Sequence, residues 1–596
     1  MPKTKTIVIF LLAVMFATMI GSSWGDSGIE DERPHIVAGY SYLTTGDYRI
    51  NPEHPPLIKD LAALPLVLKS SFTFPFDYWR ANLNSQWELG SKFLYDSGNN
   101  PDEIFFLARL PIILLSLVLG YLVFIWAKDL YGEKAGLFAL FLYAFDANII
   151  AHSRFVTTDL GISFAIFLNL YFVWKFFREP VMKYFLLAGL TFGVVLITKF
   201  SAALLVPIYF LIFVLEMIKG RDGKAEDRKF SLLFDKSIIK RGLGNILSFT
   251  LIGLIGLVVM YLFYVPHVIN MSSETAHALV AAELPNHNWT PIIEKLYDTP
   301  LMKPFAHYLL GFSMVSGHVM GGHRVFFMGN VANGFRPYYI IAFLIKTAIP
   351  TLIFLFSMLF LMFRKNIKER NLDYDKLYLL IPFAVFYGMA LQGSINLGIR
   401  YLLPVFPFIF VFVSDFANKV DLSSLSSFWR RLGVQDQKGE DSGQARMTAA
   451  VGSALFIVLL VWYALGSLNT YPHYLAYFNE SIGGPKNGAK YITDSNIDWG
   501  QDLKRLAKYV DDNKINSIAI DYFGSGRPSY YIPSSRQWKG EMGKPQGYFA
   551  ISASTYSQVT GKFKDTGEDV NPGYIWLRDE KPVANIGYSI LVFNVK

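Results

Sequence analysis

The chain has 596 residues, of which 52% are hydrophobic, 16% aromatic and 17% charged, and its mean hydropathy is +0.32. This composition points to lipid as the main solvent and excludes an ordinary soluble domain. The lack of cysteine excludes a disulfide framework, a thiol nucleophile and any cysteine-ligated zinc or iron-sulfur site. The net charge of +8 could suggest nucleic acid, but the basic residues lie mostly in short loops beside apolar runs. Membrane topology explains them better, and no nucleic acid partner is expected.

Eleven apolar runs approach the length of about 20 helical residues that crosses a hydrocarbon layer of about 30 Å. In chain order they are 6–24, 105–127, 134–151, 160–177, 183–198, 200–218, 244–265, 338–363, 376–392, 399–417 and 448–468. The fifth and sixth runs are short and are separated only by Thr198, Lys199 and Phe200. A single kinked helix at that point would reverse the topology of everything downstream.

The positions of the cations test this count, because short cytoplasmic loops collect Lys and Arg. With the basic N-terminus inside, every cation-rich loop falls on the cytoplasmic side; these loops are 128–134, 175–183, 219–241, 364–376 and 419–446. Merging the fifth and sixth runs would break that pattern, so we expect eleven spans in the cell membrane and a cytoplasmic N-terminus. The first run could instead be a cleaved signal peptide, since its start is basic and small residues stand near its end at Gly21, Ser22 and Ser23.

Three polar segments then lie outside, namely the loops 25–104 and 266–337 and the tail 469–596. The tail alternates strand-like runs with a helical stretch near 499–512, which predicts a small C-terminal α/β domain after an all-α transmembrane domain over 1–468. Within the first loop, His54 to Leu68 is too short to span and has an apolar face, so it predicts a helix lying in the membrane interface.

On this topology the unusual ionisable residues gather near the outer surface. They are Asp31, Glu32 and His54 in the first outer loop, Arg154 and Asp159 between the third and fourth spans, Lys199 between the fifth and sixth, Arg400 at the outer end of the tenth, and Lys346 about 12 Å along the eighth at 1.5 Å per residue. Ionisable groups at such depths are costly in lipid, so we expect them to face a cavity that is a functional site.

Carboxylates and several cations at the outer surface suit one chemistry in particular, the transfer of a sugar from a polyprenyl phosphate to a hydroxyl group. A carboxylate can take the acceptor proton as the anomeric carbon is attacked. Cations can hold the departing phosphate monoester. Because phosphate leaves as a weak base, no strong general acid is needed, unlike in a glycosidase with its two carboxyl groups.

Short motifs along nearly the whole chain support this interpretation. They are Asp31-Glu32, NPEHPPL at 51–57, AHSRFVTTD at 151–159, TKF at 198–200, FFMG at 326–329 with RPYY at 336–339, NLGIRYLLP at 396–404, YFNESIGGP at 477–485 and DSNIDWGQ at 494–501. In this order they resemble the lipid-carrier-dependent membrane glycosyltransferases of the GT-C class. The chain is similar to the protein O-mannosyltransferases and to the aminoarabinose transferases that modify lipid A, which are glycosyltransferases of the family 39 and 83 types.

The resemblance implies an inverting enzyme with a dolichyl- or undecaprenyl-phosphate sugar donor and a protein, lipid or glycan acceptor. It implies that Asp31, with Glu32 beside it, supplies the catalytic base and that Asp159 is the second acidic position. It also implies that Lys199 and Arg400 contact the donor phosphate, with His54, Arg154 and Lys346 as further candidates. Neither the sugar, which is a hexose or a pentose, nor the acceptor follows from these residues.

Simpler interpretations remain open for each of these residues. Asp31 and Glu32 could belong to a solvated acidic run, and Asp159 could cap the fourth span. The basic candidates Arg154, Lys199 and Arg400 could be interfacial residues whose charged ends reach water, and Lys346 could pair with a backbone carbonyl. His54 precedes two prolines, so its segment could matter mainly for shape.

A divalent cation is possible but is not indicated by a clear motif. His318 and His323 are five residues apart among glycines, and the run 494–500 departs from the calcium-loop pattern. Two other classes of protein would also carry buried charges, a transporter or lipid flippase and a non-catalytic membrane scaffold. A transporter would be expected to show two related halves with a site at the midplane, and a scaffold would leave the cluster of carboxylates and cations unexplained.

Overall fold

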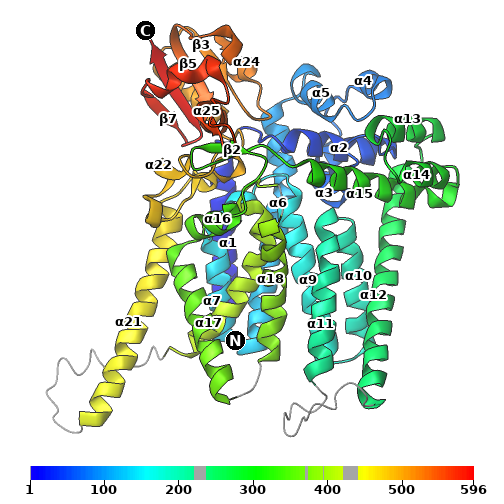
Figure 1. The fold of residues 1–596 in the computed structure, drawn as a ribbon, viewed down its shortest axis with the longest axis vertical. Coiled ribbons are helices and arrows are strands. Elements are labelled where there is room, and N and C mark those ends of the chain that lie inside the picture. Colours follow the sequence, from blue (N-terminus) through cyan, green and yellow to red (C-terminus); the bar gives the residue numbers. More distant parts are fainter. Residues whose placement is uncertain (1, 220–235, 370–372, 393–394, 421–439) are drawn as a thin grey trace.

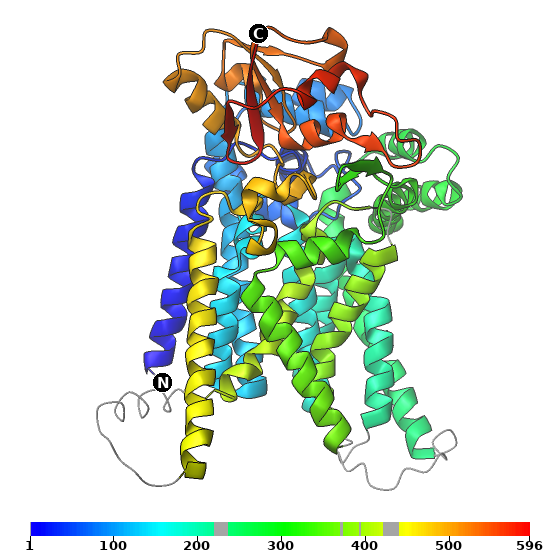
Figure 2. The ribbon, with the colours of Figure 1, turned by 60° about the vertical axis from the view of Figure 1, so that its left-hand side comes forward.

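The structure, a computed structural model, describes residues 2–219, 236–369, 373–392, 395–420 and 440–596. Long helices form a bundle, and a layer of shorter helices and a small sheet cover one end of it (Figure 1). The N-terminus lies toward the opposite end of the bundle from the C-terminal strands, in both views (Figures 1 and 2). The cation-rich segments 220–235 and 421–439, which the topology prediction used, lie outside the described residues.

Eleven helical elements occupy the positions of the eleven predicted spans. They are α1 (Pro2–Ser23), α6 (Pro101–Tyr131), α7 (Glu133–Phe145), α9 (Thr158–Arg178), α10 (Met182–Leu196), α11 (Leu205–Lys219) after η2 (Phe200–Leu204), α12 (Lys236–Val268), α17 (Ile349–Glu369), α18 (Tyr374–Gln392), α19 (Phe406–Ser414) after η4 (Ile399–Val405), and α21 (Glu440–Leu468). Within the described ranges, nine helical segments are long and apolar enough to cross a membrane, and α10 is a shorter apolar helix. The chain is thus an integral membrane protein, and the predicted all-α membrane fold is confirmed.

The boundary between the fifth and sixth predicted runs is a true chain reversal. Helix α10 ends at Leu196, Lys199 has extended backbone, and η2 begins at Phe200. The two segments therefore stand as separate elements and not as one kinked helix (Figure 1).

Two predicted spans are interrupted, which corrects their expected continuity. The run 134–151 divides into α7 and α8 (Ala147–His152) because the Asp146 side chain caps α8 by accepting from the amides of Asn148 and Ile149. The run 338–363 divides into α16 (Tyr338–Lys346) and α17, with Thr347 in extended backbone between them. In a continuous helix the ring of Pro350 would clash with the carbonyl of Lys346.

Short helices form the outer layer over the bundle (Figure 1). The first outer loop contributes α2 (Glu32–Thr45), α3 (Leu57–Lys69), α4 (Phe76–Ala81), α5 (Gln86–Ser91) and the π-helical turn η1 (Lys92–Asp96), and the second contributes α13 (Ser273–Glu283), α14 (Thr290–Tyr297) and α15 (Lys303–Gly321). The predicted helix after His54 is α3. It packs closely on α2, since a Cβ on Gly39 would lie 2.1 Å from the carbonyl oxygen of Lys59.

The C-terminal residues form the expected α/β domain. A five-stranded sheet has the order β4 (Ser535–Gln537), β3 (Ile518–Asp521), β5 (Gly547–Ser552), β8 (Ile590–Val595) and β7 (Ala584–Ile586), with β3 parallel to β4 and β5 and the other pairs antiparallel. Helix α23 (Leu503–Asp512) buries Leu503, Leu506 and Val510 in a core shared with β3 and β8.

A second small sheet joins this domain to the second outer loop. Its strands are β1 (Val325–Phe327), β2 (Asn330–Ala332) and β6 (Lys562–Phe563), in the order β1, β2, β6. Because β2 pairs with β6, the outer loop and the C-terminal domain share backbone hydrogen bonds. The outer segments therefore form one connected cover over the bundle.

Candidate active site

Four charged side chains from distant parts of the chain meet at the end of the bundle that the short helices and the C-terminal domain cover. The Nη1 atom of Arg400 donates to Oδ2 of Asp31 at 2.7 Å and lies 3.7 Å from Oδ2 of Asp159. The Nζ atom of Lys199 donates to Oδ1 of Asp159 at 2.6 Å. The order Asp31, Arg400, Asp159, Lys199 alternates negative and positive charge, and we call these four residues the charge cluster.

Local backbone structure explains how the cluster is placed. Asp31 directly precedes α2, and Asp159 lies in the first turn of α9. Lys199 sits in the extended turn between α10 and η2. Arg400 is the second residue of the 3-10 turn η4, which follows Gly398, whose φ of +105° favours glycine. Each member thus lies at or next to a helix boundary, at the covered end of the bundle.

The members of the cluster differ in their access to solvent. Relative side-chain exposure is 3% for Asp159, 9% for Arg400, 18% for Lys199 and 29% for Asp31. Asp31 is paired through one carboxylate oxygen, and within the described residues its Oδ1 makes no side-chain hydrogen bond. Asp31 is therefore the carboxylate of the cluster that can meet a further hydroxyl group, while Asp159 holds the two cations.

Two histidines lie beside the cluster. The rings of His35 and His54 are 5.4 Å apart at 78°, and Nδ1 of His35 donates to the carbonyl of Val156 at 2.9 Å. Burial lowers the pKa of both histidines, and the positive charges of Lys199 and Arg400 lower the pKa of His54 further. His54 is therefore neutral near pH 7 and can offer a hydrogen bond without adding charge.

The segment that presents His54 is held by a buried lysine that the sequence analysis missed. Lys59 is fully buried, and its Nζ contacts the carbonyl oxygens of His54 at 2.5 Å and Asn51 at 2.8 Å and the hydroxyl of Tyr42 at 2.8 Å. Burial also lowers the pKa of Lys59 well below its ordinary value. Lys59 lies on the apolar side of the predicted interfacial helix, and this position in the sequence could have indicated that the lysine is buried.

Glu32 adjoins Asp31 in sequence but does not join the cluster. Its carboxylate is fully buried and accepts from Arg109 at 2.8 and 2.6 Å, from the amide of Ile29 at 3.0 Å and from the amide of Val156 at 3.1 Å. All of its accepting positions are engaged by the protein. The expectation that Glu32 stands beside Asp31 in one pocket is therefore not supported by the geometry.

Arg154 also lies away from the cluster. It is buried, donates to the carbonyl of Ser22 at 2.8 Å and forms an ion pair with Asp26, whose other oxygen accepts from Arg505 of α23 at 2.7 Å. Burial lowers the pKa of Arg154, and Asp26 opposes that change. These contacts tie the end of α1 to the C-terminal domain, so a role in binding the donor phosphate is not supported for Arg154.

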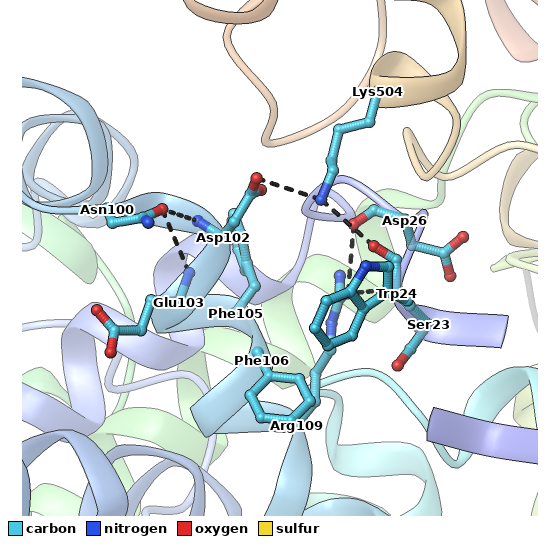
Figure 3. Close-up of a pocket in the computed structure, with 10 residues that line it drawn as sticks. All are labelled: Ser23, Trp24, Asp26, Asn100, Asp102, Glu103, Phe105, Phe106, Arg109 and Lys504. Atoms are coloured by element: carbon cyan, nitrogen blue, oxygen red, sulfur yellow. Dashed lines mark hydrogen bonds and ion pairs between the residues drawn. The ribbon is translucent and has the colours of Figure 1, made fainter. Parts of the chain in front are cut away.

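A cavity of about 310 Å³ lies beside these contacts, between the outer ends of α1 and α6 and helix α23 (Figure 3). Lys504 reaches across it, 3.2 Å from Asp102 and 3.4 Å from the carbonyl of Trp24. Asp26 and Arg109 line it, whereas none of the four members of the charge cluster does. This cavity is distinct from the candidate active site.

Lys346 is buried, but its charge is used to hold backbone. Its Nζ donates to the carbonyl oxygens of Leu475 at 2.9 Å and Asn496 at 2.6 Å, and it lies 4.5 Å from the ring centroid of Phe478. Because α16 ends at this residue, Lys346 does not lie part of the way down a continuous helix. The structure thus supports the simpler interpretation, pairing with carbonyls, over phosphate binding.

In the part of the chain that the structure describes, no group of three or more carboxylate and histidine side chains is placed to hold a metal ion. The rings of His318 and His323 are 6.5 Å apart. Asp31 and Asp159 each face a cation of the cluster.

Aromatic residues next to the cluster were not among the predicted site residues. The guanidinium carbon of Arg400 lies 4.2 Å from the ring centroid of Trp499, and Nζ of Lys199 lies 5.4 Å from that of Tyr401. Both aromatic residues belong to motifs that the sequence analysis identified, at 396–404 and 494–501. The contact of Trp499 with Arg400 could not be foreseen because it depends on how the C-terminal segment folds back onto the bundle.

Comparison with known families gives one match. The sequence profile of the family described as dolichyl-phosphate-mannose-protein mannosyltransferase matches residues 102–222, a segment that includes Asp159 and Lys199. Over this segment the predicted resemblance to the protein O-mannosyltransferases is confirmed. None of the curated protein sequences matches the chain.

Several solved structures are similar in fold. ArnT from Cupriavidus metallidurans bound to undecaprenyl phosphate is 13% identical, with 98% of this chain and 97% of that chain covered and a TM-score of 0.44. Archaeal oligosaccharyltransferase AglB from Archaeoglobus fulgidus, in complex with an inhibitory peptide and a dolichol-phosphate, is 11% identical, with coverages of 94% and 71% and a TM-score of 0.44. The S. cerevisiae protein O-mannosyltransferase Pmt1-Pmt2 complex bound to the sugar donor is 19% identical, with coverages of 48% and 37% and a TM-score of 0.33.

Proposed function

We propose that this chain is an inverting membrane glycosyltransferase that moves a sugar from a polyprenyl-phosphate carrier to an acceptor hydroxyl group on the extracytoplasmic face. The charge cluster is the observation that carries this proposal. It combines one accessible carboxylate, Asp31, with two cations, Arg400 and Lys199, at the outer end of a membrane bundle. The family match over residues 102–222 supports it independently.

In the proposed reaction, the acceptor oxygen bonds to the anomeric carbon as the bond from that carbon to the phosphate oxygen breaks. Asp31 takes the acceptor proton, and the polyprenyl phosphate leaves with the electron pair of the broken bond. Attack opposite the leaving group inverts the anomeric configuration. Because the departing group gains negative charge, nearby cations stabilise the transition state more than the ground state.

Lys199 and Arg400 are the cations that would meet the phosphate. Each already pairs with a carboxylate, so they are held in place before the donor binds. Asp159 is nearly inaccessible and contacts both cations, and we assign it to orienting them. The neutral His54 could add a hydrogen bond to the phosphate.

We propose a protein Ser or Thr hydroxyl as the acceptor, in keeping with the family that matches residues 102–222. A lipid A or glycan hydroxyl is the alternative, and the transferred sugar can be a hexose or a pentose of the family 39 or 83 type. In this proposal residues 1–468 form the transmembrane unit with a cytoplasmic N-terminus, and residues 469–596 form an extracytoplasmic domain. A transporter is less well supported because the charge cluster lies at one end of the spans and not at their midplane.

The direct test is transfer by the purified full-length protein in detergent. Labelled polyprenyl-phosphate sugars are offered with Ser- and Thr-containing peptides and, separately, with lipid A. We expect labelled acceptor with inverted anomeric configuration from the wild type and at least about 100-fold less from Asp31→Asn, which retains shape but loses the base. No transfer from any donor by the wild type, or equal turnover by the variant, would contradict the proposal.

A further inference from the structure

The segment 494–501 lies between the C-terminal domain and the bundle, and it contacts Arg400 and the residues that precede Asp31. It begins in the 3-10 turn η8 (Asp494–Asn496) and ends just before α23. Most of its residues are buried, including Asn496 and Trp499. The proposed function assigns none of these residues a role.

On one side, the segment holds the turn that carries Arg400. Oδ1 of Asn496 accepts from the amide of Ile399 at 2.9 Å, and the hydroxyl of Ser495 bonds to the carbonyl of Leu397. The approach is close, because a Cβ on Gly398 would lie 2.8 Å from Nδ2 of Asn496. The backbone on both sides of Gly398 is thereby fixed by side chains of the 494–501 segment.

On the other side, the segment holds the chain that carries Asp31. The amide of Glu30 donates to the carbonyl of Trp499 at 3.0 Å. The hydroxyl of Ser27 donates to the carbonyl of Gly500 at 2.7 Å, and the amide of Ser27 donates to the carbonyl of Gln501 at 2.9 Å. The backbone at 499–501 therefore sets the position of the residue before Asp31.

The side chain of Trp499 packs on Arg400, while its backbone carbonyl accepts from the chain that carries Asp31. It is 1% exposed, and its ring centroid lies 4.2 Å from the guanidinium carbon of Arg400. The ring of His152 meets it at 6.0 Å and 64°. A guanidinium over an indole face is attracted by the ring, most strongly where both are desolvated. Trp499 thus covers the face of Arg400 whose edge donates to Asp31.

We infer that Trp499 is a positioning residue that keeps the Arg400 guanidinium aligned between Asp31 and Asp159, and that the C-terminal segment 494–501 thereby completes the donor-phosphate site. This inference rests on the proposed function. Trp499 acts through Arg400 and need not touch the substrate. The C-terminal domain then contributes to donor binding.

The test compares two substitutions of Trp499 in the full-length protein. Trp499→Phe keeps an aromatic face beside Arg400, whereas Trp499→Leu removes it. The matched control is Trp576→Leu, since Trp576 is partly buried in the C-terminal domain and its indole donates to the carbonyl of Gly573. The KM for a labelled polyprenyl-phosphate sugar, the KM for the acceptor and the dissociation constant for polyprenyl phosphate alone are measured for each variant.

We expect Trp499→Leu to raise the donor KM and the dissociation constant by about 10- to 30-fold, as loss of a desolvated cation–π contact would do. The acceptor KM should change less than about twofold. Trp499→Phe should recover most of the donor affinity, since benzene faces also attract guanidinium groups. The control should leave all three constants near the wild-type values.

The outcomes separate this inference from the proposed function. A Trp499→Leu variant that binds the donor as tightly as the wild type would overturn the positioning role. Equal losses of donor and acceptor affinity in both Trp499 variants would also overturn it, because that pattern indicates general misfolding. If the wild type binds polyprenyl phosphate but transfers no sugar, the proposed function fails, and the binding constants still decide the role of Trp499. If the wild type does not bind polyprenyl phosphate, both are overturned.

Discussion

Replacing Glu30, Asp31 and Glu32 one at a time by the corresponding amide separates a catalytic carboxylate from a structural one. The three residues are neighbours in sequence, but the structure gives them different surroundings. Glu30 is 23% exposed and lies 3.4 Å from Arg33, Asp31 is 29% exposed beside Arg400, and Glu32 is fully buried against Arg109. Three substitutions of the same kind should therefore have three different effects.

Glu32→Gln should impair folding. The amide loses the charge that balances the buried guanidinium of Arg109, and breaking a buried ion pair on one side costs about 3–5 kcal/mol. Its NH₂ group accepts no hydrogen bond, so one of the two backbone amides that donate to the carboxylate, that of Ile29 or that of Val156, also loses its acceptor. A loss of this size is a large part of the total stability of about 5–15 kcal/mol that is typical of a soluble domain.

Asp31→Asn and Glu30→Gln should leave the folded protein largely intact. The pair between Asp31 and Arg400 is partly exposed, and Arg400 keeps Asp159 as a neighbour. The pair between Glu30 and Arg33 is of the kind that contributes about 0–1 kcal/mol. Asp31→Asn should nevertheless lower turnover by at least about 100-fold, while Glu30→Gln should stay near the wild-type rate.

The assay combines thermal unfolding in detergent, followed by tryptophan fluorescence, with transfer from labelled donor at a temperature at which all variants are folded. The wild type and Glu30→Gln serve as references for both measurements. A Glu32→Gln variant that unfolds like the wild type but transfers no sugar would refute this reasoning and would point to Glu32 as the base.

Three further variants test other parts of the site. Lys199→Gln should raise the donor KM by about 10- to 100-fold, as expected for loss of a hydrogen bond from a charged group, while the exposed control Lys69→Gln should not change it. The same donor KM in Lys199→Gln and in the wild type would show that Lys199 does not bind the phosphate. Lys346→Met should lower the unfolding temperature, because two buried carbonyls lose their donor at about 1–3 kcal/mol each, whereas Lys368→Met should not change it. A normal unfolding temperature for Lys346→Met would contradict the assigned contacts. The pKa of His54 is lower in the folded protein than in the unfolded chain. Below about pH 6.5 the unfolded chain binds a proton at this residue that the folded protein does not bind, so the free energy of unfolding falls by about 1.4 kcal/mol per pH unit. The pH dependence of stability below pH 6.5 should therefore be shallower in His54→Asn, and an unchanged dependence would show that burial does not keep His54 neutral.

The sequence was sufficient to predict the membrane architecture because apolar length and the distribution of cations are local signals. The eleven predicted runs coincide with helical elements, and the separation at Lys199 follows the cation pattern. The breaks at Asp146 and Thr347 were not predicted. They depend on a side-chain cap and on a proline whose effect reaches four residues back, and both lie within otherwise apolar runs.

The candidate site was predicted in part. Asp31, Asp159, Lys199 and Arg400 do converge, as their shared position at the outer ends of spans suggested. The sequence could not say which charged residues would find partners elsewhere in the protein.

Residues far along the chain decide that question. Arg109 engages Glu32, Asp26 engages Arg154, and the carbonyls of Leu475 and Asn496 engage Lys346. Sequence distances of 77, 128 and 129 or more residues separate these partners, so no local pattern indicates them. The contact of Trp499 with Arg400 also joins residues that are far apart in the sequence, so no local pattern indicates it either.

The most direct test of the central claim is an experimental structure of the full-length protein with polyprenyl phosphate bound. The charge cluster predicts that phosphate oxygens lie at hydrogen-bond distance, about 2.7–2.9 Å, from Nζ of Lys199 and from the guanidinium of Arg400, with the carboxylate of Asp31 facing the space that the sugar would fill. A phosphate bound at the cavity between Trp24 and Lys504, or anywhere out of reach of both cations, would contradict the account.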